Sequence, residues 1–162
     1  MALQPVDLTI LNDLFEHMEI RGVPYIWGGK ANNDLGNPGH AKNGGLGTDS
    51  INIVGLDCSG FTQFAIYRGT EGKVVVPEGS VEQRDWASTH LKLAGSYNAV
   101  NNGEGLYWSF FAPHGDRPGH TWMTRQNWTR ESKGGIGIYS RPWNHPTLVR
   151  RVEATYILPS FR

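Results

Sequence analysis

The chain has 162 residues, a length that suits one domain with a hydrophobic core of its own. It has 15 basic and 15 acidic residues and a single cysteine, so an intramolecular disulfide is excluded. The neutral total conceals an asymmetry. Residues 1–116 carry 7 basic and 13 acidic residues, a net −6, and residues 117–162 carry 8 and 2, a net +6. A basic C-terminal part suits either an anionic polymer or a set of solvated strand faces.

Several classes of partner lack a signature in the sequence. No run of four or more basic residues and no nucleic-acid-binding fingerprint occurs, so we predict no nucleic-acid partner. No stretch resembles a membrane span, so no membrane partner is expected. Residues 1–15 contain Asp7 and Asp13 but no Lys or Arg, so they lack the basic region of a signal peptide. We therefore expect synthesis in a cytoplasm without a signal, or earlier removal of one.

The first half of the chain reads as helices separated by a long loop. Apolar residues at helical spacing predict a helix over 7–21, which Asp7 can cap and Gly22 can end. Residues 30–55 are rich in Gly and Asn, and we interpret them as an insertion that forms an ordered loop or a mobile specificity flap and buries little. Further helices are predicted from Cys58 to about Tyr67 and near 81–93.

The second half reads as strands. Strands are predicted at 106–111, 136–139 and 155–158, and a hairpin at 121–124 and 128–131 with its turn near Gln126-Asn127. Helices first and strands later indicate an α+β fold with an antiparallel sheet. We interpret residues 1–162 as one domain.

Cys58 is the first candidate for chemistry. It lies at the predicted start of a helix, directly after Asp57, whose carboxylate suits the N-cap. A helix N-terminus favours negative charge and lowers the pKa of a thiol, and the thiolate is the reactive form. The alternative is a buried, inert cysteine that packs as a small apolar residue.

A cysteine nucleophile needs a base and a third group that orients the base. Of six histidines, His120 stands apart because it begins an apolar strand. If the hairpin turn holds an even number of residues, His120 and Glu131 are diagonal neighbours on one face of the sheet, and Glu131 can orient the imidazole. An odd turn would place Glu131 on the other face. His145, in a turn-like segment, is not expected to take this part.

A zinc site is the competing interpretation of these side chains. His114, Asp116, His120 and Cys58 are the imaginable ligands. No pair has the close spacing of typical zinc ligands, so we predict no metal and no other cofactor.

Three segments, in order, resemble the NlpC-type cell-wall peptidases: VPYIWGG at 23–29, LDCSGF at 56–61, and Gly119-His120. The segments 131–135 and 140–143 resemble phage-borne members. The resemblance implies a papain-like fold, in which the helix that bears the nucleophile packs on an antiparallel β-sheet. It implies Cys58 as nucleophile, His120 as base and, by order along the chain, Glu131 as the third catalytic residue.

The resemblance also implies a substrate. Family members cleave amide bonds in peptidoglycan stem peptides, in particular the bond between D-glutamate and a diamino acid. We expect a monomeric phage lysin or tail-associated hydrolase that acts on the cell wall. The residues expected to contact substrate are those beside the nucleophile and one on the His120 strand: Tyr25, Trp27, Asp57, Ser59 and Trp122.

Two other functions remain open from the sequence. An interbacterial amidase toxin would share the fold and would have an immunity protein as partner. A non-catalytic module that binds glycan or peptide would use a groove rich in tryptophan, but it would not need Cys58, His120 and Glu131.

Overall fold

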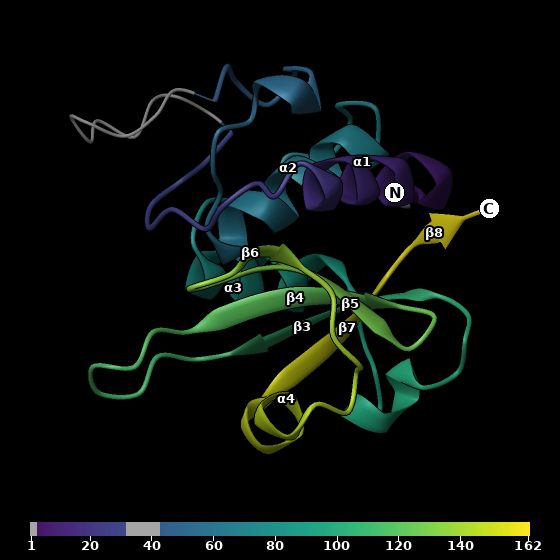
Figure 1. Cartoon of the computed structure of the whole chain (residues 1–162). Coiled ribbons are helices and arrows are strands. Elements are labelled where there is room, and N and C mark those ends of the chain that lie inside the picture. The colour runs from purple at the N-terminus through teal and green to yellow at the C-terminus, as the bar shows by residue number, and fades with distance from the viewer. Residues whose placement is uncertain (1–2, 32–42) are drawn as a thin grey trace.

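The chain folds into a layer of helices over an antiparallel sheet (Figure 1). The computed structural model describes residues 3–31 and 43–162. On one side of the sheet lie α1 (Leu8–Ile20), α2 (Cys58–Gly69) and α3 (Ser80–His90), and on the other side lies α4 (Pro146–Arg151). Two short 3-10 helices, Ser50–Asn52 and Tyr97–Val100, occur in the connections. No helix in the described parts of the chain is both long and apolar enough to cross a bilayer.

The main sheet has six strands in the order β2-β7-β3-β4-β5-β6, and every neighbouring pair is antiparallel. Its strands are β2 (Lys92–Leu93), β3 (Leu106–Phe111), β4 (His120–Arg125), β5 (Trp128–Lys133), β6 (Gly137–Tyr139) and β7 (Ala154–Leu158). A separate parallel pair, β1 (Val6–Asp7) and β8 (Ser160–Phe161), holds the two ends of the chain together. The predicted α+β arrangement is confirmed, whereas α4, β1, β2 and β8 were not predicted.

The predicted hairpin is the part of the sheet that positions the site. Gln126 and Asn127 have φ angles of 53° and 69°, so they form a two-residue turn with both residues in the left-handed region. Arg125 pairs with Trp128, so the turn between them has two residues. The same register pairs Thr124 with Thr129 and Met123 with Arg130. Of the two registers that the sequence left open, the structure therefore has the one that brings His120 and Glu131 together.

The two faces of β4 serve different purposes. Met123 packs into the main core beneath α1 and α2, whereas Trp122 packs with Leu148 of α4 on the opposite face. Since side chains alternate along a strand, His120 shares the face of Trp122. The site lies where the first residue of β4, His120, meets the start of α2.

The central helix α2 is buried on almost every side. Its residues from Cys58 to Ile66 are all buried, so its stability comes from the layers that enclose it. Gln83 of α3, itself fully buried, donates hydrogen bonds to the backbone oxygens of Ser59 and Pro77 and accepts one from Thr62. These bonds hold the start of α3 beside the start of α2.

The flanks of the insertion at 30–55 are more buried than the sequence indicated. Residues 32–42 lie outside the described residues, but in the flanks Ala31, Asn43 and Ile53 are almost completely buried. The Asn43 amide donates to the backbone oxygens of Lys30 and Gly55, 2.7 and 2.8 Å away, and so joins the two flanks. Arg21 of α1 donates to the backbone oxygens of Ser50 and Ile53. The prediction that the whole insertion buries little is wrong for these flanks, because side-chain hydrogen bonds satisfy their backbone.

Close backbone contact explains the glycines of the first two motifs. A Cβ atom added to Gly60 would lie 2.1 Å from the carbonyl oxygen of Gly29, and one added to Gly29 would lie 2.8 Å from the oxygen of Ile26. The first turn of α2 thus rests directly on the chain before the insertion, without an intervening side chain.

We predict that Gly60→Ala destabilises the protein by about 1–3 kcal/mol or more, because the new methyl group must displace backbone rather than a flexible side chain. Gly95→Ala is the matched control, since a Cβ there meets nothing within 4 Å and no positive φ has to be kept. Urea denaturation of both variants measures the difference. Equal stability of the two would contradict the described contact.

Candidate active site

Cys58 is the first residue of α2. The side chain of Asp57 caps the helix and accepts a hydrogen bond from the backbone N–H of Gly60 at 2.7 Å. The thiol is mostly buried, with 7% of the residue exposed, and it borders a cavity described below. The predicted position of the cysteine at a capped helix N-terminus is confirmed.

His120 lies between Cys58 and Glu131. Its Nε2 is 2.7 Å from Oε1 of Glu131, and the side chain of Cys58 is near enough to raise the pKa of the ring. Because Nε2 is used by the carboxylate, Nδ1 is the ring nitrogen that remains for the thiol. The contact between His120 and Glu131 that the hairpin register predicts is present.

Glu131 is held from its other side by an arginine that the sequence did not reveal. Arg141 follows β6, and its Nε and Nη2 each donate to a different oxygen of the carboxylate at 2.9 Å. Glu131 is 0% exposed and Arg141 3% exposed, so this bidentate ion pair is closed to solvent. The carboxylate is thereby fixed in position and in charge.

These contacts set the charges of the buried groups. Burial lowers the pKa of His120, but hydrogen bonds to Cys58 and Glu131 and the negative charge of both groups outweigh it and raise the pKa to about 9. Burial raises the pKa of Glu131, but His120 and Arg141 outweigh it and lower the pKa to about 2. The arrangement therefore favours an imidazolium between the Glu131 carboxylate and the sulfur of Cys58, which is suited to nucleophilic catalysis by cysteine.

Lys30 is a second residue that the sequence did not single out. It is 8% exposed and forms an ion pair with Asp57, the cap of α2. The oxygen Oδ1 of Asp57 already accepts from Gly60 and from the Ser59 hydroxyl, and Lys30 holds Oδ2. The double glycine before Lys30 was the sequence feature that could have indicated this contact, because it lets the segment pack closely against α2.

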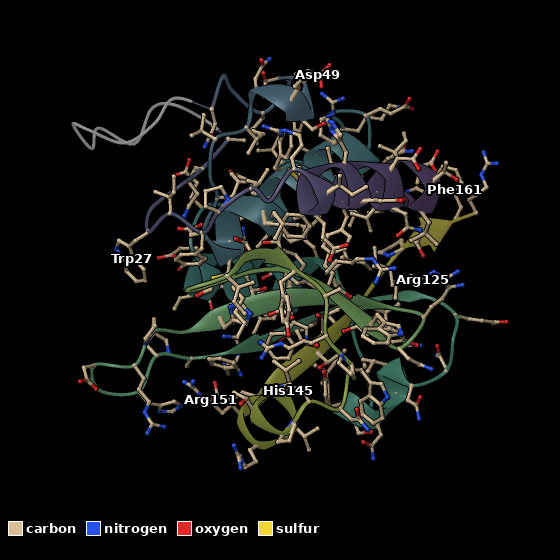
Figure 2. All side chains as sticks on the ribbon, viewed as in Figure 1. Trp27, Asp49, Arg125, His145, Arg151 and Phe161 are labelled. Atoms are coloured by element: carbon tan, nitrogen blue, oxygen red, sulfur yellow. The ribbon has the colours of Figure 1, made fainter. Side chains whose placement is uncertain are left out.

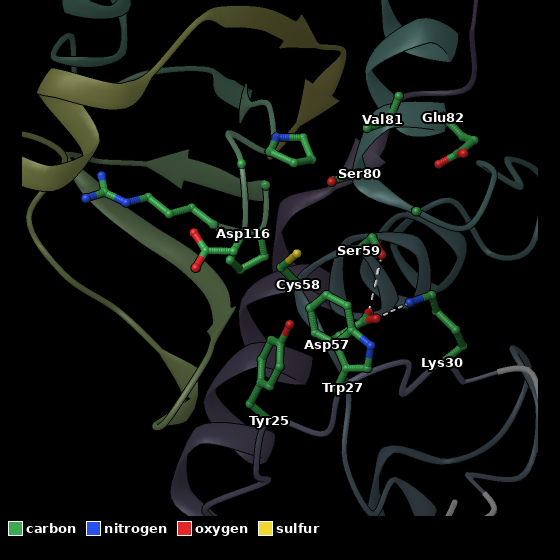
Figure 3. A pocket seen from close by; sticks show the side chains of 16 residues that line it. Tyr25, Trp27, Lys30, Asp57, Cys58, Ser59, Ser80, Val81, Glu82 and Asp116 are labelled. Atoms are coloured by element: carbon green, nitrogen blue, oxygen red, sulfur yellow. Dashed lines mark hydrogen bonds and ion pairs between the residues drawn. The ribbon is translucent and has the colours of Figure 1, made fainter. Parts of the chain in front are cut away.

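Two cavities meet at the Cys58–His120 contact. The first, the Cys58 cavity, has a volume of about 520 Å³ and includes Cys58 but not His120 in its wall (Figure 3). The second, the His120 cavity, has a volume of about 450 Å³ and includes His120 but not Cys58. Tyr25, Pro118 and Gly119 line both. The two cavities provide room for a substrate on each side of the reacting groups.

Four of the five residues predicted to contact substrate lie in the wall of the Cys58 cavity: Tyr25, Trp27, Asp57 and Ser59. Trp27 is 68% exposed, and Figure 3 shows the Tyr25 hydroxyl pointing toward the thiol. Burial, followed by the nearby charges of Cys58 and Asp57, raises the pKa of Tyr25 well above its usual value, so its hydroxyl remains a hydrogen-bond donor. Asp57 and Ser59 are buried and bonded to one another, so their polar atoms support the helix start.

The assignment of Trp122 as a substrate contact is wrong. Trp122 is 0% exposed, and its ring stacks on His120 with centroids 5.6 Å apart and an angle of 18° between the planes. It lies beneath the imidazole as part of the core and limits how the ring can rotate.

The side chains considered as zinc ligands do not converge on one point. His114 is bound to Glu153 at 2.9 Å, on the surface, whereas His120 is bound to Glu131. Within residues 3–31 and 43–162 there is no group of three or more His, Cys, Asp or Glu side chains placed to hold a metal ion.

Comparison with known proteins identifies the fold. No family model and no curated protein matches the chain. Among solved structures, an NLP/P60-family protein similar to a lipoprotein, from Staphylococcus aureus subsp. aureus Mu50, superposes with a TM-score of 0.58 at 14% identity and covers 99% of this chain. An NlpC/P60-family protein from Bacillus cereus ATCC 10987 gives 0.55 at 19% identity over 90% of this chain. The P60 domain of an antigen from M. avium subspecies paratuberculosis gives 0.55 at 20% identity over 95%.

The lengths of these neighbours differ. The chain spans 46% of the Staphylococcus protein and 39% of the Bacillus protein, but 96% of the mycobacterial domain. At these identities the similarity establishes the fold. The predicted α+β, papain-like fold and the resemblance to NlpC-type proteins are thus confirmed at the level of structure.

We predict that Lys30→Met destabilises the protein by about 3–5 kcal/mol, because it leaves the buried Asp57 carboxylate without its cation. Lys73→Met is the control, since Lys73 is exposed and has no ion pair among the described residues. Urea denaturation at pH 7 measures both. A loss within about 0.5 kcal/mol for Lys30→Met would mean that the ion pair does not stabilise the start of α2.

Proposed function

We propose that this protein is a cysteine peptidase that hydrolyses an amide bond in the stem peptides of peptidoglycan. The observation that carries the proposal is the buried chain Cys58–His120–Glu131, placed where two cavities meet. The NlpC/P60 fold of the neighbouring structures supports the substrate class. We further propose the bond between D-glutamate and a diamino acid as the one cleaved.

The geometry supports the following acylation step. The Cys58 thiolate attacks the amide carbon, and the electron pair of the carbonyl moves to oxygen. The backbone N–H of Cys58, at the first turn of α2, and the Tyr25 hydroxyl are the proposed donors to that oxyanion. When the C–N bond breaks, the imidazolium of His120 gives its proton to the leaving amine, and a thioester remains on Cys58.

Deacylation uses the same groups in the opposite sense. Neutral His120 takes a proton from water, the hydroxide adds to the thioester carbon, and the C–S bond breaks. The acid product leaves, and the thiolate–imidazolium pair is restored. Glu131 keeps its charge throughout, because Arg141 and His120 lower its pKa to about 2.

We propose a role in phage lysis or in a phage tail, supported by the resemblance of segments 131–135 and 140–143 to phage-borne proteins. An interbacterial toxin would use the same chemistry and would need an immunity protein.

A non-catalytic module with a tryptophan-rich binding groove receives less support. Among the described residues that line the two cavities, Trp27 is the one tryptophan, and Trp108 and Trp122 are 0% exposed.

Cys58→Ala is expected to lower peptidoglycan hydrolysis by about 10³-fold or more while the fold is kept, because the nucleophile is lost. Purified peptidoglycan from a wall with a diamino acid is digested, and the fragments are identified by mass spectrometry. Wild-type fragments should carry one new amine and one new carboxyl group per cut. Full activity of Cys58→Ala, or fragments from cleaved glycosidic bonds, would refute the proposed reaction.

Glu131→Gln is expected to lower kcat by about 10²–10⁴-fold and to move the alkaline limit of activity to lower pH. The carboxylate helps to raise the pKa of His120 to about 9, so its loss lowers that pKa and the imidazolium disappears at a lower pH. The measurement is a pH profile of kcat, with circular dichroism to verify the fold.

Glu104→Gln removes the same charge from an exposed position and serves as the control, for which the wild-type profile is expected. Glu131→Asp retains the negative charge beside Arg141 and His120 and should keep the alkaline limit above that of Glu131→Gln. An unchanged alkaline limit in a folded Glu131→Gln variant would remove Glu131 from the proposed mechanism.

A further inference from the structure

The two cavities divide a substrate between them. His120 must lie next to the amine that leaves, because it supplies the proton, and His120 belongs to the wall of one cavity alone. It follows that the amine component of the substrate occupies the His120 cavity, and the acyl component the Cys58 cavity. In Figure 2, Trp27 lies on the helical side of the sheet, and Arg151 and His145 lie on the opposite side, next to α4.

The wall of the His120 cavity is basic. Lys133, Arg141 and Arg151 contribute to it, and none of the described residues that line it is Asp or Glu. The nearest buried carboxylate, that of Glu131, is 0% exposed and already paired with Arg141 and His120. The positive charges of Lys133 and Arg151 are therefore not neutralised by the cavity itself.

Arg151 has unused capacity to bind an anion. Its guanidinium carbon lies 3.9 Å from the centroid of the Phe111 ring, and this contact holds the group against the cavity wall. Its Nη2 is buried and has no hydrogen-bond partner in the described structure. A buried, unpaired guanidinium nitrogen is costly unless a ligand completes it.

His145 adds a neutral donor to the same wall. Its Nδ1 accepts a hydrogen bond from the backbone N–H of Thr147 at 3.3 Å, so the neutral ring carries its proton on Nε2. Arg151, Lys133 and the imidazole N–H of His145 all donate hydrogen bonds, and among the described residues of the cavity wall no carboxylate competes with a ligand for them. Such a set suits a carboxylate.

The Cys58 cavity has the opposite character. Glu82 and Asp116 line it together with Arg117, and its lysine, Lys30, is bound to Asp57. The difference in charge between the cavities would orient a substrate that carries its anion on the amine component.

We propose that the His120 cavity binds a free carboxylate on the amine component of the substrate, with Arg151 and Lys133 as the main contacts. This inference rests on the proposed function. It predicts that the enzyme selects a diamino acid whose second carboxyl group is free over one in which that group is a carboxamide.

Two soluble substrates test the proposal. Both are γ-glutamyl amides of the same diamino acid, with the carboxyl group beside the scissile amide blocked as a methylamide. One has a free carboxylate next to the distal amine, and the other has a primary carboxamide there. The quantity compared is the ratio of their kcat/KM values. For the wild type we expect a preference of about 10–100-fold for the carboxylate, the usual effect of one or two charge-assisted hydrogen bonds.

Arg151→Met should reduce that ratio at least about fivefold, mainly through a higher KM for the carboxylate substrate. Arg150→Met is the matched control, because Arg150 lies on the same helix but is exposed and outside both cavities, and the wild-type ratio should persist. If Arg151→Met loses its fold, as judged by melting temperature, Lys133→Met provides the same test from β5.

The outcomes separate the two proposals. Equal kcat/KM for both substrates, or a wild-type ratio retained in folded Arg151→Met and Lys133→Met variants, overturns the carboxylate site and leaves the proposed peptidase intact. Failure to cleave either substrate or purified peptidoglycan overturns the proposed function and the inference with it.

Discussion

The buried carboxylate of Glu131 is the interaction on which the candidate site depends. A negative charge without solvent is tolerated only if cations and hydrogen bonds compensate it, and here Arg141 and His120 do so from two sides. Since Arg141 donates to both oxygens of the carboxylate, the carboxylate cannot turn, and its Oε1 holds the imidazole in one orientation. The stacking of Trp122 on the same ring removes the remaining freedom.

The rest of the fold brings a thiol to this fixed imidazole. The two-residue turn at Gln126-Asn127 sets the register that places Glu131 near His120. The start of α2 is held by a separate set of contacts: the Asp57 cap, its ion pair with Lys30, and the direct contact of Gly60 with the backbone of Gly29. Cys58 and His120 thus meet because the start of strand β4 and the start of helix α2 are each anchored by separate contacts.

Local patterns in the sequence predicted much of this arrangement. Helical spacing and capping predicted α1 and α2, and the turn residues predicted the hairpin. Its register stayed open between an even and an odd turn until the structure showed two turn residues. The role of Arg141 was missed because its contact with Glu131 depends on how the chain turns after β6, and no periodic pattern in the sequence predicts that turn. Trp122 was misjudged because alternation along a strand tells which residues share a face but not whether helix α4 covers that face. The burial of Lys30 and of the flanks of the insertion could not be predicted, because it depends on hydrogen bonds from Arg21 and Asn43 to residues distant in the sequence.

The central claim is that the protein holds His120 as an imidazolium between Cys58 and Glu131 at neutral pH. A titration of the His120 ring nitrogens by ¹⁵N NMR in the intact protein tests it most directly, since it reports the proton of that ring without a substrate. The account predicts that both nitrogens remain protonated through neutral pH and that the transition falls near pH 9. A transition at or below the ordinary histidine value of about 6.5 would contradict it.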